Sequence, residues 1–236
     1  MIGLSTKDVV LSILEKNRGS YVSSRDIISE AGVSRNAVWK AVNELKKSGY
    51  DIESVTNKGY CLSSESDVIS VQAIGTFLKN KSLADRIVIY DELASTNKAA
   101  KLSLITGEDD RNIIIARRQT EGVGHSSEHY ESPEGGIYIS IIITPEKHSN
   151  KKLKASAIGK KVAEVIEKQS GHKAELDKST NRIYINKKKV CGILTEYIAD
   201  LETGDVSCYI VGIGIKMKNM QKNRMIAKVI EGILQL

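Results

Sequence analysis

The residues best placed to contact another molecule in the first part of the chain lie at the start of one predicted helix. Arg35, Asn36 and Lys40 follow the predicted cap Ser34 and lie off the apolar stripe of that helix. Arginine can pair with guanine, asparagine with adenine, and lysine with phosphate. Lys58, in a predicted turn, suits a phosphate or minor-groove contact. These residues predict a site for double-stranded DNA.

The same polar side chains have a simpler interpretation, as the solvated surface of a small helical domain that contacts other proteins. The charge of this region is modest. Residues 1–64 carry six Lys and three Arg against three Asp and four Glu, a net charge of +2. Because phosphate contacts supply much of DNA affinity, so small a charge predicts a homodimer that places two domains on one operator.

Serine caps and glycine stops divide this region into short elements. Three predicted helices begin at Ser5, at Ser23 or Ser24 and at Ser34, and they end at Gly19, Gly32 and Gly49. Two short strands are expected at 50–54 and 60–63, around the turn 56–59. Three helices followed by a hairpin predict a winged helix-turn-helix domain over residues 1–64, whose third helix enters the major groove.

Composition sets the class of protein. The chain has 236 residues, 41% of them hydrophobic and 27% charged, with a net charge of +6. No apolar run reaches the roughly 18 residues that a membrane span needs, and the first 20 residues lack a signal-peptide pattern. The three cysteines are odd in number and far apart, so neither a disulfide framework nor a zinc site is expected. A cytoplasmic location is predicted.

The remaining sequence alternates strand and helix patterns. Residues 65–83 are expected to form a linker and a connecting helix over 71–78, and residues 84–236 a second domain. Strands are predicted at 87–90, 113–116, 137–143, 182–185, 190–197 and 207–215. Helices are predicted at 97–104, 152–168 and 222–234. This pattern predicts an α+β fold, an α/β domain on a mainly antiparallel sheet.

Several short motifs follow one another in this second domain. They read Ser95-Thr96-Asn97, Gln119 with Gly122-Val123-Gly124, Ser132-Pro133, Gly136-Ile137-Tyr138-Ile139-Ser140, Lys178 to Gly192, and Gly212-Ile213-Gly214-Ile215. Behind a winged helix, this ordered set resembles the biotin protein ligases that double as biotin operon repressors. That family joins biotin to ATP as biotinyl-adenylate and then transfers biotin to a lysine of a carrier protein.

The resemblance implies a ligand site for biotin or a related small effector. Ser95, Thr96, Asn97 and Gln119 match the residues that hold the ureido end of biotin, and their hydroxyl and amide groups suit a planar urea. Ser95-Thr96-Asn97 can equally be a helix start. Lys189 matches the lysine at the reacting carboxylate and phosphate and is the one catalytic candidate. It also stands in a lysine run that can be a solvated turn.

Glycines are retained where the family brings ligand close to backbone. These positions are Gly122, Gly124, Gly192, Gly212 and Gly214. The charged positions are not retained. The family loop is rich in arginine, but here it contains Val123, His125 and Glu128, and the acidic and amide residues beside magnesium are matched by Arg182 and Lys216. The chain is also expected to lack the family's C-terminal β-barrel.

These departures predict that ATP and magnesium do not bind in the family's geometry. The spacing of His125 and His129 does not predict a metal site, because no third ligand is evident. The preferred interpretation is a DNA-binding regulator that senses biotin or a related ligand without activating it. The alternatives are an active biotin protein ligase that is also a repressor, and a structural dimer that senses nothing.

Overall fold

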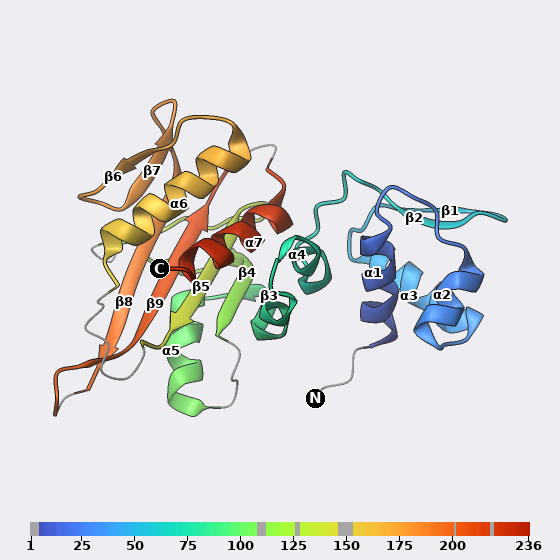
Figure 1. Ribbon diagram of the computed structural model, residues 1–236, viewed down its shortest axis with the longest axis horizontal. Coiled ribbons are helices and arrows are strands. Elements are labelled where there is room, and N and C mark those ends of the chain that lie inside the picture. The colour runs from blue at the N-terminus through green and yellow to red at the C-terminus, as the bar shows by residue number, and fades with distance from the viewer. Residues whose placement is uncertain (1–4, 108–111, 126–127, 146–152, 201, 218–219) are drawn as a thin grey trace. The chain divides into compact units, whose positions relative to one another are not determined.

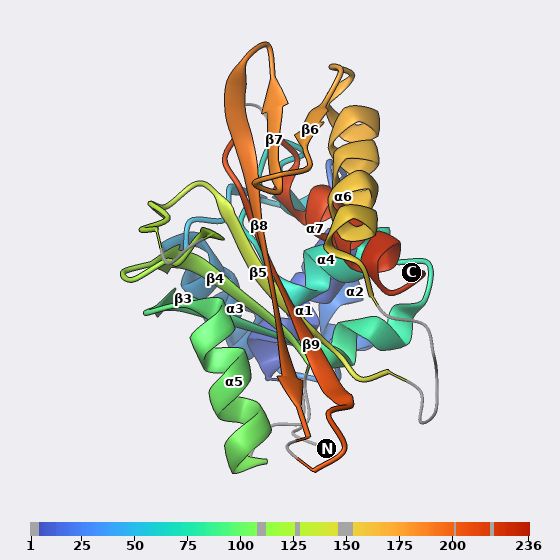
Figure 2. The same ribbon diagram turned by 90° about the vertical axis from the view of Figure 1, so that its left-hand side faces the viewer.

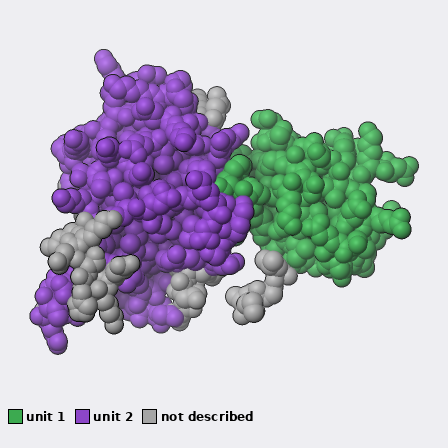
Figure 3. All heavy atoms as spheres, in the orientation of Figure 1, with its two compact units in different colours: residues 1–77 green, residues 78–236 purple. Residues whose placement is uncertain are grey.

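The computed structural model describes residues 5–107, 112–125, 128–145, 153–200, 202–217 and 220–236. The chain forms two compact units, residues 1–77 and residues 78–236, here called the N-terminal and C-terminal units (Figure 3). Within the described residues, no helix is both long and apolar enough to cross a membrane.

The N-terminal unit begins with three helices whose caps are local serines. They are α1 Thr6–Lys16, α2 Ser24–Ala31 and α3 Arg35–Lys47 (Figure 1). Ser5 and Asp8 form a reciprocal capping box, and the side chains of Ser23 and Ser34 each accept a backbone N–H of the following helix. Gly32 ends α2 in the left-handed conformation that glycine adopts without strain. The three predicted helices are therefore present.

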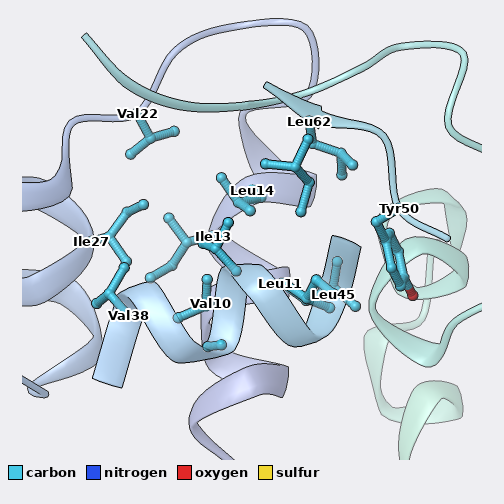
Figure 4. Packing of buried hydrophobic residues seen from close by; sticks show 13 residues of the cluster. Val10, Leu11, Ile13, Leu14, Val22, Ile27, Val38, Leu45, Tyr50 and Leu62 are labelled. Carbon is cyan, nitrogen blue, oxygen red and sulfur yellow. The ribbon is translucent and has the colours of Figure 1, made fainter. Parts of the chain in front are cut away.

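The hairpin and a fourth helix complete this unit. Strands β1 Ile52–Val55 and β2 Gly59–Leu62 pair antiparallel. Helix α4 Val71–Phe77 packs on α1, and the Gln72 amide donates to the Asp8 carboxylate over 3.1 Å. The hairpin of β1 and β2 is here called the wing. Side chains from the three helices and the wing meet in one apolar core, which Figure 4 shows around Ile13, Leu14 and Leu62. The predicted winged helix-turn-helix fold is confirmed.

The C-terminal unit is built on one sheet, seven-stranded within the described residues. Its strands are β3 Ile87–Leu93, β4 Ile113–Gln119, β5 Ile137–Ile143, β6 Glu175–Asp177, β7 Arg182–Ile185, β8 Lys188–Ala199 and β9 Val206–Ile215. Their order is β3-β4-β5-β9-β8-β7-β6, and β3 and β4 run parallel while all other pairs are antiparallel. The predicted mainly antiparallel α+β fold is confirmed.

Helices cover both faces of this sheet. Helix α5 Thr96–Thr106 lies on one face, and α6 Ala155–Ser170 and α7 Lys222–Ile233 pack together on the other (Figure 2). A short 3₁₀ helix, Lys81–Arg86, precedes β3. The face that carries α5 also carries the predicted ligand residues, as described below.

Element boundaries differ from the predictions at several places. β3, β4 and β8 are longer than predicted, and the three-residue strand β6 was not predicted. Residues 153 and 154 precede α6, so the predicted helical start at 152 is wrong for these two residues, and Lys152 itself lies outside the described residues. No side chain caps α6, which explains why the sequence lacked a start signal at Ala155.

Candidate functional site

The first group of predicted ligand residues lies where α5 begins beside the end of β4. Because β3 and β4 are parallel with Leu93 opposite Gln119, the Gln119 side chain reaches the first turn of α5. Its Oε1 accepts hydrogen bonds from the Thr96 backbone N–H over 2.8 Å and from the Thr96 hydroxyl over 3.1 Å. Ser95 occupies the N-cap position but makes no capping hydrogen bond with its side chain. Gln119 therefore supplies the cap of α5.

A chain of buried polar side chains continues from Thr96 across the sheet. The Ser140 hydroxyl lies 2.7 Å from Thr96 Oγ1 and 2.5 Å from Asn97 Oδ1. The Asn97 amide donates to Glu196 over 2.8 Å. A Cβ on Gly212 would lie 2.3 Å from Asn97 Oδ1, so only glycine there lets Asn97 lie flat on β9. The group is thus held rigidly by its own hydrogen bonds.

The loop after β4 folds back as a small hairpin. The Tyr130 N–H donates to the Gly122 carbonyl over 2.7 Å, and the Gly124 N–H donates to the Glu128 carbonyl over 2.7 Å. The Gln119 amide fixes its far end by donating to the Ser132 hydroxyl over 2.8 Å. A Cβ on Gly122 would lie 2.3 Å from the Tyr130 carbonyl oxygen, so this close return requires glycine. Ser126 and Ser127, part of the same predicted loop, lie outside the described residues.

Tyr130, at the end of this hairpin, packs against β8 and β9 and forms the floor of a pocket on the α5 face of the sheet. Its hydroxyl donates to the Gly214 carbonyl over 2.8 Å, and the residue is only 8% exposed. A Cβ on Gly192 or Gly214 would lie 2.7 or 2.5 Å from its ring. Burial raises the pKa of the Tyr130 phenol well above its usual value, so the group stays neutral. Two glycines that we expected to admit a ligand therefore admit Tyr130.

Two lysine side chains approach the Tyr130 ring. Lys189 Nζ lies 5.1 Å and Lys216 Nζ 4.8 Å from the ring centroid, and Lys216 also donates to the Glu131 carbonyl over 3.1 Å. Arg182 pairs with Glu128. Burial lowers the pKa of Lys189, and the charges of Arg182 and Lys216 lower it further. The charge of the Glu128 carboxylate is thus balanced by Arg182, a pair that the sequence did not predict.

The structure brings the predicted ligand residues together in one pocket on the α5 face of the sheet. All of them except Gly122 line it, and Gly122 lies in the hairpin beside it. Lys189 is on β8, and the tight turn before β8 contains Asn186 and Lys187, so only the first part of the lysine run forms a turn. Sequence reasoning gave no role to Tyr138 or Thr180, which also line the pocket.

The predicted DNA residues lie on α3 and its cap, and in the turn between β1 and β2. Arg35, Asn36 and Lys40 are exposed on α3, whereas the Ser34 hydroxyl accepts the Ala37 N–H over 3.2 Å and is committed to the helix cap. Lys58 lies at the wing, with its Nζ 5.5 Å from the centroid of the Tyr21 ring. Both Arg35 and Lys58 line a groove formed by α2, the start of α3 and the wing.

Trp39 was missed by sequence reasoning. It is the single tryptophan of the chain, and it is 56% exposed on α3, one helical turn after Arg35. The apolar stripe of α3 instead consists of Val38, Ala41, Val42 and Leu45. The exclusion of Trp39 from that stripe was the signal in the sequence, because a large apolar side chain left outside the core often marks a binding surface.

Comparison with known proteins agrees with both units. Residues 91–216 match the biotin/lipoate A/B protein ligase family, and residues 7–61 match a helix-turn-helix (HTH) domain family. The chain resembles in fold the crystal structure of the biotin acetyl coenzyme A carboxylase synthetase of Helicobacter pylori with bound biotinylated ATP. That similarity has a TM-score of 0.51 and 19% identity, over 63% of this chain and 73% of the other.

Two relatives share both parts of this architecture along the sequence. The bifunctional ligase/repressor BirA of Bacillus subtilis is 33% identical over 92% of this chain and 66% of its own length. The protein of the same name from Escherichia coli is 29% identical over 84% of this chain and 60% of its own length. The chain thus spans no more than about two thirds of these relatives. With more than half of its residues matched by the family, it belongs to the biotin/lipoate A/B protein ligase family.

Proposed function

We propose that this chain is a DNA-binding transcriptional regulator that senses biotin or a related small ligand through a biotin-ligase-like unit without activating it. The observation that carries this proposal is the charge of the pocket. Arg182 and Lys189 line the pocket, and Lys216 Nζ lies 4.8 Å from the centroid of the Tyr130 ring. By the resemblance, Arg182 and Lys216 stand on the magnesium side of a nucleotide site. In this function the chain keeps a site for the ligand but does not join the ligand to ATP.

Magnesium does not fit these residues. Mg²⁺ prefers oxygen ligands in octahedral geometry, and the guanidinium of Arg182 and the ammonium of Lys216 are donors with positive charge. Within the described residues, no cluster of three His, Cys, Asp or Glu side chains is placed to hold a metal ion. We therefore assign no step to magnesium or to Mg-ATP.

A neutral polar head group does fit the other end of the pocket. The Gln119 amide has two N–H donors, of which one is used by Ser132. The carbonyl of a urea can accept a hydrogen bond from the second N–H of the Gln119 amide. The side-chain oxygens of Thr96 and Asn97 can accept hydrogen bonds from the N–H groups of the urea. The buried hydrogen bonds between these side chains hold them in place before ligand arrives, which lowers the entropy cost of binding.

The N-terminal unit supports the DNA-binding half of the proposal. Its exposed α3 residues face away from the core, and the groove beside the wing is lined by Arg25, Arg35 and Lys58. The modest charge of the unit favours two copies on one operator, so we propose a homodimer as the DNA-bound form.

An active biotin protein ligase that is also a repressor is the second candidate. The names of the two BirA relatives favour it, as does Lys189, which lies on the pocket rim at the position of the family's lysine. In that case Lys189 would contact the reacting carboxylate of biotin and donate hydrogen bonds to it. Labelling of a biotin carboxyl carrier protein that depends on ATP separates the two candidates.

Small molecules retained by the purified full chain test the sensing function most directly. Mass spectrometry after denaturation should detect biotin or a ring-bearing relative. A duplex selected by the protein from a random pool should then bind with an affinity that changes when biotin is added. Thr96→Ala should remove this response and leave DNA binding without ligand nearly unchanged. A normal response in Thr96→Ala would place the ligand elsewhere.

A further inference from the structure

A carboxylate outside the pocket holds the side chain of Asn97. Glu196, on β8, accepts a hydrogen bond from the Asn97 amide on Oε2 over 2.8 Å, and its Oε1 accepts one from the Lys101 ammonium over 2.7 Å. Asn97 lines the pocket, whereas Glu196 and Lys101 are not among the described residues that line it. Any effect of Glu196 on a ligand must therefore pass through Asn97.

The carboxylate of Glu196 sets the direction of the hydrogen bonds that follow. An ionised carboxylate only accepts, so Asn97 Nδ2 faces Glu196 and Asn97 Oδ1 faces Ser140. A serine hydroxyl has one proton, and Ser140 donates it to Asn97 Oδ1 over 2.5 Å. Ser140 then has only lone pairs left for its other neighbour, the Thr96 hydroxyl.

The Thr96 hydroxyl lies between two acceptors. It is 2.7 Å from Ser140 Oγ and 3.1 Å from Gln119 Oε1. The Gln119 oxygen is fixed in this position because it also accepts the Thr96 backbone N–H, which can only donate. The one hydroxyl proton of Thr96 is thus used within the network, toward Ser140 or Gln119. Toward the pocket the Thr96 hydroxyl offers lone pairs and acts as an acceptor.

We propose that Glu196 is a positioning residue that makes the Thr96 hydroxyl an acceptor, so that the pocket selects a ligand whose head group carries an N–H at this point. This inference rests on the proposed sensing function and adds a rule of specificity to it. A ring urea carries such an N–H. A ring of the same shape with oxygen in place of the N–H would set its lone pairs against those of Thr96, which disfavours binding.

Lys101 gives the substitution Glu196→Gln a defined outcome. The ammonium of Lys101 only donates, so the introduced amide should keep its oxygen on Lys101 and turn its NH₂ group toward Asn97. Asn97 should then rotate, with its oxygen toward position 196 and its NH₂ group toward Ser140. Ser140 would donate to Thr96, and Thr96 could donate its own proton to the ligand. The polarity of the Thr96 hydroxyl would be reversed.

Two small rings of the same shape measure this polarity. Imidazolidin-2-one has two N–H groups, and ethylene carbonate has ring oxygens in their place. Ligand-observed NMR with the full chain gives both dissociation constants. We expect the unsubstituted protein to prefer imidazolidin-2-one by at least about tenfold, as for one hydrogen bond lost and its acceptor opposed. Glu196→Gln should reduce this preference to less than about threefold. Glu121→Gln, which removes the charged partner of Lys98 on the same helix, is the matched control and should keep it.

Exchanging both partners separates positioning from a general loss of structure. In the double variant Asn97→Asp with Glu196→Gln, the introduced amide can donate to the carboxylate at position 97, which also accepts from Ser140. The original direction of the network is restored, so the preference for imidazolidin-2-one should return to at least about fivefold. A merely structural role of Glu196 would weaken the binding of both rings and leave their ratio unchanged.

Nuclear Overhauser effects in the unsubstituted protein test the network without any variant. The side-chain amide protons of Asn97 should give contacts to the γ protons of Glu196, and contacts to the β protons of Ser140 in their place would overturn the proposal. An unchanged ratio of the two rings in Glu196→Gln would also overturn it, while biotin binding would leave the sensing function intact. If neither biotin nor either ring binds the folded protein, the sensing function fails as well.

Discussion

Gln119 caps helix α5 from a different strand by accepting the backbone N–H of Thr96 over 2.8 Å. Loss of a side-chain cap costs about 0.5–2 kcal/mol, so Gln119→Ala should lower the free energy of unfolding by about 1 kcal/mol. Urea unfolding at 25 °C measures this. Ser95→Ala is the matched control, because Ser95 holds the cap position without making the bond, and it should cost less than half as much. A larger loss of unfolding free energy in Ser95→Ala than in Gln119→Ala would contradict the assignment of the cap to Gln119.

Substitutions in the N-terminal unit should distinguish residues that contact bases from residues that contact phosphates. Arg35→Ala or Asn36→Ala should weaken binding to a selected duplex more than to an unrelated duplex, because these side chains are exposed at the start of α3, where we propose base contacts. Lys58→Ala should weaken both about equally and reduce the salt slope by about 1, as expected for one phosphate contact. Fluorescence anisotropy over a series of salt concentrations gives both quantities. Unchanged sequence discrimination in Arg35→Ala would refute the role of α3.

Trp39 offers a direct optical test of the same surface. As the single tryptophan and an exposed one, it should be quenched by iodide in the free protein. A bound duplex that covers α3 should protect it. Iodide quenching that is unchanged at saturating duplex would show that DNA does not cover this turn of the helix. Trp39→Phe provides the matched protein without the fluorophore.

Biotin with Mg-ATP should yield no biotinyl-adenylate at a useful rate. The resemblance places transition-state charge opposite Val123, His125, Glu128, Arg182 and Lys216, none of which repeats the family's residue. Each lost electrostatic contact costs on the order of 10² to 10³ in rate by analogy with an oxyanion-hole donor. Pyrophosphate release should be measured beside the B. subtilis BirA relative as a positive control. Release above background would favour the ligase alternative.

Local chemistry explains what could be predicted about the fold. The caps Ser5, Ser23 and Ser34 bond to N–H groups three residues away, so their role is contained in a short stretch of sequence. The cap from Gln119 could not be predicted in this way, because it spans 23 residues and depends on the parallel pairing of β3 with β4.

In the pocket, too, some features could be predicted from short stretches of sequence and others depend on long-range pairing. The motifs predicted which polar residues and glycines gather there, but not what covers the glycines. Gly192 and Gly214 become neighbours only through the register of β8 with β9, and the ring of Tyr130 reaches them only through the return of its hairpin at Gly122. Such long-range placement follows from the packed sheet and not from the periodicity of any one segment.

The packing of the Tyr130 ring on Gly192 and Gly214 also limits which substitutions this unit tolerates. A Cβ at Gly192 or Gly214 would lie 2.7 or 2.5 Å from the ring, so a larger residue at either position must move the ring. Moving the ring would also strain the return of the hairpin, because the Tyr130 N–H donates to the Gly122 carbonyl. The side chain at position 130 and the residues at 192 and 214 are therefore expected to change together and not one at a time.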